Sequence, residues 1–160
     1  MMEYRDDYYF MEKALRQARA AYRRGEVPVG AVVVKENEVI ARGFNLREST
    51  RDPAAHAELL AIRRAARRLN SWRLTGCTLY VTLEPCPMCA GAILNSRIER
   101  VVFGAYDAKA GCCTTLYHLC SDPRFNHRAW ILGGIMEKDC ADILSSFFEE
   151  KRKKSIEKHF

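Results

Sequence analysis

The sequence has no long uninterrupted run of apolar residues, no internal repeat and no low-complexity segment. No apolar run approaches the roughly 20 residues that a membrane-spanning helix needs. The first residues, Met-Met-Glu-Tyr-Arg-Asp-Asp, are too polar for a secretory signal. We therefore expect a cytoplasmic protein with no membrane partner. In that compartment its 7 cysteines would mostly stay reduced, and their odd number argues against a framework built only of disulfides.

The chain also lacks any linker-like segment that would divide it. Its 160 residues, 48% of them hydrophobic, are enough to bury one core of ordinary size. The sequence therefore predicts a single domain that spans residues 1–160.

Apolar residues recur either at helical spacing or in short strand-like runs, and the two kinds of segment alternate. Helices are expected at about 8–24, 53–69, 87–96 and 114–119, with a basic C-terminal helix at about 138–158. Strands are expected at 29–34, 38–44, 78–83, 100–105 and 129–132, the first two forming a hairpin that turns at Glu36-Asn37. Strands separated by helices indicate parallel pairing with crossover connections, as in an α/β fold.

Two short motifs contain residues that commonly bind metals, at spacings typical of metal sites. They are His56-Ala57-Glu58 and Pro85-Cys86-Pro87-Met88-Cys89. His56, Cys86 and Cys89 would fill three positions of a tetrahedral zinc site, and a catalytic site keeps the fourth open for water. Cys86 and Cys89 would share one side of a first helical turn, and Pro87 suits a helix start. Asp52 is a candidate N-cap for the helix that carries His56.

Glu58 lies two residues after the histidine and need not be a ligand. Zinc lowers the pKa of bound water to about 7, and a nearby carboxylate can act as both general base and general acid. Glu58 is therefore the candidate catalytic residue. The alternatives are a structural zinc knuckle or a redox pair, but a knuckle needs a fourth ligand. Only Cys112 and Cys113 stand as rival ligands, because no second Cys-x-x-Cys or His-x-His pair is present.

At these residues the chain resembles the zinc-dependent nucleobase deaminases, and within them the bacterial tRNA adenosine deaminases. The resemblance covers nearly the whole chain in order. It includes the segments 26–31, 43–45, 56–58, 79–86, 88–91, 96–98, 101–105, 107–109, 126–128 and the Phe147-Phe148 pair. It implies a three-layer α/β/α cytidine-deaminase-like fold, with a mixed five-stranded sheet between helices.

The resemblance implies one zinc ion per subunit, a homodimer, and conversion of adenosine to inosine at the first anticodon position of a tRNA, with an arginine tRNA as the expected substrate. It also implies substrate contacts from the pocket and from the RNA-binding surface. The expected substrate-binding residues are Asn45, Val29, Ala57, Asp107, Lys109, Asn126, His127, Phe148 and Arg152. The alternative interpretation is that Asn45 only forms a turn and that His127 is an ordinary surface residue.

The net charge of +6 is compatible with a polyanionic partner such as the anticodon stem-loop. Cationic residues cluster at Arg63, Arg64, Arg67 and Arg68, and again at 151–154. The first cluster is read as a solvated helix face. The second, beside Phe148, is interpreted as a site for phosphate contact and base stacking, with Phe147 as a possible core residue.

The chain departs from the bacterial pattern at Ser121–Arg124, at Tyr106 and at the Cys112-Cys113 pair. Because these positions differ, the sequence does not predict how flanking nucleotides are recognised.

Two other functions would use the same zinc ligands and glutamate. One is a deaminase of a free nucleobase or nucleoside, of guanine or cytosine type, which needs no basic tail. The other is a non-catalytic zinc-binding subunit of an editing complex, against which Glu58 argues because such a subunit needs no proton shuttle.

Overall fold

The computed structural model describes residues 5–159; the first four residues of the polar start lie outside the described residues. A five-stranded sheet has the order β2-β1-β3-β4-β5. Its strands are β1 (Gly30–Lys35), β2 (Glu38–Phe44), β3 (Cys77–Leu83), β4 (Arg100–Ala105) and β5 (Trp130–Leu132). β1 pairs antiparallel with both β2 and β3, whereas β3, β4 and β5 are parallel. The expected mixed sheet is therefore confirmed.

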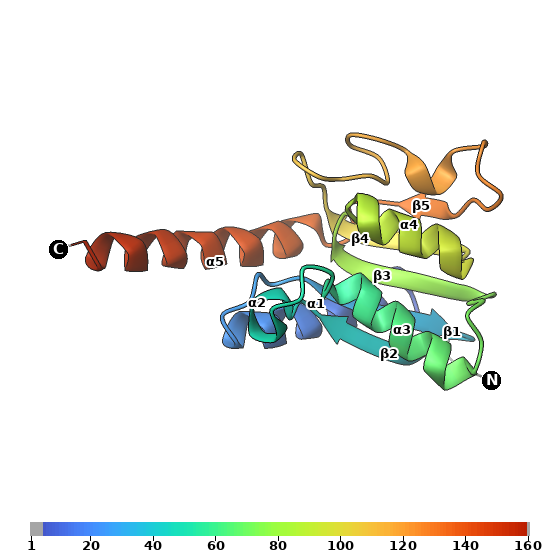
Figure 1. Ribbon diagram of the computed structural model, residues 1–160, viewed down its shortest axis with the longest axis horizontal. Coiled ribbons are helices and arrows are strands. Elements are labelled where there is room, and N and C mark those ends of the chain that lie inside the picture. The colour runs from blue at the N-terminus through green and yellow to red at the C-terminus, as the bar shows by residue number, and fades with distance from the viewer. Residues whose placement is uncertain (1–4, 160) are drawn as a thin grey trace.

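Helices cover both faces of this sheet, which makes the three layers that the resemblance implied (Figure 1). They are α1 (Asp7–Arg23), α2 (Arg47–Thr50), α3 (Ala57–Leu69), α4 (Pro87–Ser96) and α5 (Glu137–Glu157), with a short 3₁₀ helix η1 (Leu119–Ser121). Among the described residues, no helix is both long and apolar enough to cross a membrane.

The central strands β1, β3 and β4 are largely buried on both faces because each face packs against helices. In β1, Ala31 and Val33 belong to the core shared with α3 and α4, while Val32 and Val34 belong to the core shared with α1. This is the alternation expected of a buried strand with a side-chain period of two. The predicted hairpin turn is also present, with positive φ at Glu36 and Asn37, as a tight two-residue connection requires.

Two expectations about helices are wrong. Residues 114–119 do not form a helix but turns that lead into η1, because the Leu119 N–H bonds to the Cys112 carbonyl instead of the Thr115 carbonyl four residues before it. The helix expected at 53–69 begins at Ala57, and the short α2 precedes it. Asp52 does not cap α3, since its side chain accepts from the Ala54 N–H in a local turn.

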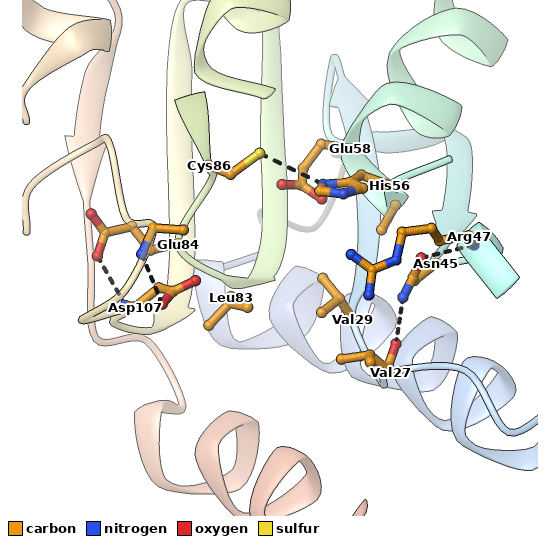
Figure 2. Close-up of a pocket in the computed structure, with 12 residues that line it drawn as sticks. Val27, Val29, Asn45, Arg47, His56, Glu58, Leu83, Glu84, Cys86 and Asp107 are labelled. Atoms are coloured by element: carbon orange, nitrogen blue, oxygen red, sulfur yellow. Dashed lines mark hydrogen bonds between the residues drawn. The ribbon is translucent and has the colours of Figure 1, made fainter. Parts of the chain in front are cut away.

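A glycine brings α3 close to the sheet. A Cβ on Gly43 of β2 would collide with the Ala57 carbonyl and the Ala61 N–H, so only glycine allows this approach. As a result the start of α3 lies against the end of β2. The packing places Asn45, directly after β2, beside the segment that carries His56 (Figure 2).

The last helix is anchored near its middle and then leaves the body of the protein (Figure 1). Phe147 is buried, and its ring lies edge-on to Tyr22 of α1 at 5.6 Å between centroids. Every residue from 148 to 159 is exposed. The expectation that Phe147 could be core is confirmed. Cys140, earlier in α5, is also buried, so the first half of this helix packs on the core and residues 148–159 do not.

Candidate active site

The three predicted metal ligands converge at two helix starts. His56 is the N-cap of α3, Cys86 is the N-cap of α4, and Cys89 lies in the first turn of α4. His56 therefore stands one residue before its helix and not within the first turn as expected. The reason is that the turn over residues 51–56 delays the start of α3. Pro87 occupies the first helical position, where its missing N–H costs nothing.

The spacing of the ligand atoms fits zinc. The Nδ1 atom of His56 lies 3.6 Å from the Sγ atom of Cys86 and 3.6 Å from that of Cys89. Zn–N distances of about 2.05 Å and Zn–S distances of about 2.3 Å at tetrahedral angles place N and S roughly 3.6 Å apart. Within the described residues, this trio is the group of possible ligand atoms that lie within 4.8 Å of one another. The residues present thus match a three-ligand zinc site.

The contact between the two thiols shifts their pKa values in opposite directions. The hydrogen bond from Cys89 lowers the pKa of Cys86 to about 4, and the Cys86 thiolate in turn raises the pKa of Cys89. The bond to Cys86 likewise raises the pKa of His56. A divalent cation would ionise both thiols and hold the imidazole neutral.

Glu58 lies at the inner end of the site, with 4% of its surface exposed. Figure 2 shows its carboxylate beside the His56 ring. Burial raises the pKa of Glu58 more than its own backbone N–H and the Cys89 thiol lower it. A carboxylate in this position can take up and release a proton at the metal without being a ligand.

These residues line a cavity of about 230 Å³. Pockets for drug-sized ligands usually measure about 300–1,000 Å³, so this one suits a single heterocyclic base. It is lined by Val27, Val29, Asn45, Arg47, His56, Ala57, Glu58, Leu83, Glu84, Cys86, Asp107 and Ala110. Of the expected substrate-binding residues, Asn45, Val29, Ala57 and Asp107 are therefore brought together with the metal ligands.

Asn45 lines the pocket and also makes a turn. Its side-chain oxygen accepts from the Arg47 N–H at 3.1 Å, and its amide nitrogen donates to the Val27 carbonyl at 3.2 Å. Asp107 is similarly held, because its Oδ1 accepts from the N–H groups of Lys109 and Ala110. Both side chains are thus fixed before any ligand enters.

The other expected contacts lie outside this cavity. Lys109 and Asn126 are exposed, as are Phe148 and Arg152 on the projecting half of α5. His127 is half-buried, and its Nε2 lies 2.6 Å from the Ile98 carbonyl, just beyond the C-terminal end of α4. The metal ligands lie at the opposite end of that helix.

Five of the lining residues were not predicted as site residues: Val27, Arg47, Leu83, Glu84 and Ala110. Two of these five are charged. Arg47 follows the strand end by three residues, and Glu84 precedes the Pro-Cys motif. Asn-x-Arg directly after a strand was the available signal for Arg47. For Glu84 the signal was a carboxylate that ends an otherwise apolar strand. Either pattern is too common to carry a prediction alone.

The remaining cysteines are core residues. Cys77, Cys112, Cys113, Cys120 and Cys140 are all buried. The Sγ atoms of Cys113 and Cys120 lie 3.6 Å apart, away from the ligand trio. In the described structure the Cys112-Cys113 pair therefore does not supply a fourth ligand.

Comparison with known proteins agrees with this geometry. Residues 4–105 match the family described as the cytidine and deoxycytidylate deaminase zinc-binding region. Two similar curated proteins are both named tRNA-specific adenosine deaminase. The one from Bacillus subtilis (strain 168) is 53% identical over 148 residues, which is 92% of each chain. The one from Aquifex aeolicus (strain VF5) is 48% identical over 149 residues, covering 92% of this chain and 97% of the relative.

Solved structures show the same fold. A chain from a study of A-to-I editing by tRNA:A34 deaminases at the wobble position superposes with a TM-score of 0.82 at 46% identity, covering 85% of this chain and 99% of that one. A guanine deaminase from Bacillus subtilis has a TM-score of 0.61 at 39% identity, covering 64% and 66%.

The chain belongs to the cytidine and deoxycytidylate deaminase family and, within it, to the group whose members are named tRNA-specific adenosine deaminase.

Proposed function

We propose that this chain is a zinc-dependent enzyme that converts adenosine to inosine at the wobble position of tRNA. The observation that carries the proposal is the convergence of His56, Cys86, Cys89 and Glu58 on one base-sized cavity. The reaction adds water to the carbon that bears the amino group and releases ammonia. Zinc, when bound, activates that water.

The protein residues have separate tasks in this reaction. His56, Cys86 and Cys89 would hold one zinc ion per subunit. The Glu58 carboxylate takes a proton from the attacking water and returns one to the departing amine. Val29 and Ala57 form apolar walls for the base, and Asn45 offers polar atoms to the ring edge from a fixed position.

The exposed half of α5 supports a polynucleotide substrate. Cationic residues at 151–154 and the exposed ring of Phe148 lie on a helix that projects into solvent. Lys151 lies over the Phe147 ring and the Phe148 ring contacts it edge-on, but the Phe148 ring and the cationic side chains stay exposed and can make phosphate contacts and stack on bases. By contrast, Arg64 and Arg68 of α3 donate to carbonyls of β2, which fits the solvated-face interpretation of that cluster.

A homodimer is the proposed assembly. Large apolar side chains are exposed on α4, on β5 and on the segment between β4 and β5. They are Met88, Leu116, Tyr117, Phe125, Trp130 and Leu132. A second copy of the chain would cover them, and would bring Lys109, Asn126 and His127 into a composite groove.

We further propose that residues 1–160 are one domain, that the enzyme works in the cytoplasm, and that an arginine tRNA is its substrate.

The rival with a specific observation in its favour is deamination of free guanine, because a guanine deaminase shares this fold at 39% identity. Measuring ammonia release from an anticodon stem-loop, from adenosine and from free guanine separates the two functions. We expect turnover on the stem-loop and essentially none on guanine. Turnover on guanine with none on the stem-loop would overturn the proposal.

The role of the tail is tested by ending the chain after Phe147, which keeps the anchor of α5. Because residues 148–159 are exposed, we expect an unchanged melting temperature. Binding of the stem-loop should weaken, and its salt dependence should become shallower, since phosphate contacts are lost. Equal affinity across a salt titration would contradict this role for the tail.

A further inference from the structure

Arg47 supplies the permanent positive charge of the pocket lining. The other lining residues in the described chain are neutral, acidic or potential metal ligands. Figure 2 shows the guanidinium of Arg47 extending from the α2 side over Val29, toward the opening below His56. In the described part of the chain, no ion pair within 4.0 Å and no side-chain hydrogen bond involves this guanidinium (Figure 2).

The backbone around Arg47 is fixed from two sides. On one side, the Asn45 side chain accepts from the Arg47 N–H. On the other, Glu26 accepts from the N–H groups of Glu48 and Ser49 and from the Ser49 hydroxyl. Glu26 is only 1% exposed, so its contacts are protected from water. A four-residue helix has little stability of its own, and these contacts account for its defined position.

The pocket is electrically asymmetric. Arg47 and Asn45 form one wall, whereas Asp107 and Glu84 form the opposite wall (Figure 2). A base that enters from a polynucleotide brings its two flanking phosphodiesters to the rim of the cavity. An anion is favoured beside Arg47 and disfavoured beside the two carboxylates. The guanidinium also matches phosphate oxygens through paired hydrogen bonds.

We infer that Arg47, held by Glu26 and Asn45, binds a phosphodiester next to the target nucleoside and so makes the pocket selective for a base within an RNA chain over a free base. This inference rests on the proposed function. Arg47 would act on substrate binding, and Glu26 would act through Arg47 as a positioning residue.

The first experiment measures binding and turnover of an anticodon stem-loop by Arg47→Gln. Loss of a charge-assisted contact should raise KM by roughly 10- to 100-fold. The change in kcat should be smaller, and the slope of log affinity against log salt should fall by about 1. Arg51→Gln removes the same charge nearby but outside the pocket, and should leave KM within about twofold.

The second experiment locates the contact with stem-loops that carry one uncharged methylphosphonate, either 5′ or 3′ of the target adenosine. On one of these two substrates, wild type and Arg47→Gln should bind almost equally, because the phosphate charge is already gone. An unchanged effect of Arg47→Gln on both substrates would overturn the inference and indicate stacking on a base instead.

Glu26→Gln tests the positioning role. An amide cannot accept all the bonds that the carboxylate accepts, so α2 should loosen while zinc content stays the same. KM should rise, and the double variant with Arg47→Gln should be little worse than either single variant. Additive effects would refute coupling between the two residues.

Wild-type turnover distinguishes a failure of the proposed function from a failure of the role of Arg47. If wild type does not deaminate the stem-loop, the proposed function fails. If wild type is active but Arg47→Gln keeps wild-type KM and salt slope, only the role of Arg47 fails.

Discussion

Glu58 and Glu84 are both buried and both line the same cavity, with exposed fractions of 4% and 2%. Their surroundings are nevertheless opposite. Glu84 accepts hydrogen bonds from the backbone N–H groups of Asp107, Cys113, Thr114 and Thr115, and from the Thr115 hydroxyl. Glu58 has a smaller set of favourable partners, since its own backbone N–H, the charge of His56 and the Cys89 thiol favour its ionised form.

The direction of each pKa shift depends on the number of hydrogen-bond donors around the carboxylate and not on how deeply it is buried. Burial acts on both residues to raise the pKa. At Glu84 the bonds from Thr115, Thr114 and Asp107 outweigh it and bring the pKa below its usual value. At Glu58 burial prevails and the pKa is raised. A carboxylate surrounded by donors anchors a loop, whereas one with few donors next to metal ligands can exchange protons.

The largest expected effect separates these roles directly. Glu58→Gln keeps the shape of the side chain but removes the proton acceptor. Turnover should fall by about 100- to 10,000-fold, while zinc content and melting temperature stay close to wild type. Metal analysis beside an inosine assay measures both. An active Glu58→Gln enzyme would remove the distinction between the two glutamates.

Glu84→Gln should show the reverse pattern. An amide leaves some of the N–H groups at 107–115 without an acceptor, so the free energy of unfolding should fall by about 2–3 kcal/mol. Turnover per folded molecule should fall far less than in Glu58→Gln. Urea unfolding measures the first quantity, with the exposed Glu38→Gln as control.

Gly111→Ala offers a second check on the Glu84 anchor, because an added Cβ would collide with the Glu84 carboxylate and with the Asp107 carbonyl of the loop that it holds. It should destabilise the protein in the same way without changing any charge. Wild-type stability in both Glu84→Gln and Gly111→Ala would show that this carboxylate anchors nothing.

The smallest effect concerns Glu26, a second anchoring carboxylate. Burial alone would raise its pKa, but bonds from Ser49 and Glu48 hold it below the ordinary 4.5. A depressed folded-state pKa contributes stability that is present above about 4.5 and is lost as the pH falls through the lower value. The difference in unfolding free energy between wild type and Glu26→Gln should therefore shrink from pH 6 to about pH 3. If this free-energy difference stays constant over the pH range, the Glu26 carboxylate does not stabilise the fold through its charge.

Much of the fold could be predicted because its signals are local. The hairpin at Glu36-Asn37, the buried strands and the long helices follow from turn chemistry and periodicity. The expected helix at 114–119 failed because the Leu119 N–H bonds to the carbonyl of Cys112, seven residues before it, so the chain turns there instead of continuing as a helix. The start of α3 was misplaced because Asp52 bonds within its own turn.

The sequence by itself determined the chemistry of this protein. His56 with Glu58, and Cys86 with Cys89, indicate a zinc site with a proton-transfer group, because ligand identity and the spacing within each motif are local properties. The fold then brings the two motifs together. Only the tertiary structure decided which other residues face that site. The distances from Glu26 to α2 and from Glu84 to the 107–115 loop depend on how strands and helices pack. Packing is therefore what brought Arg47 and Glu84 into the pocket and left Asn126, His127 and Phe148 outside it.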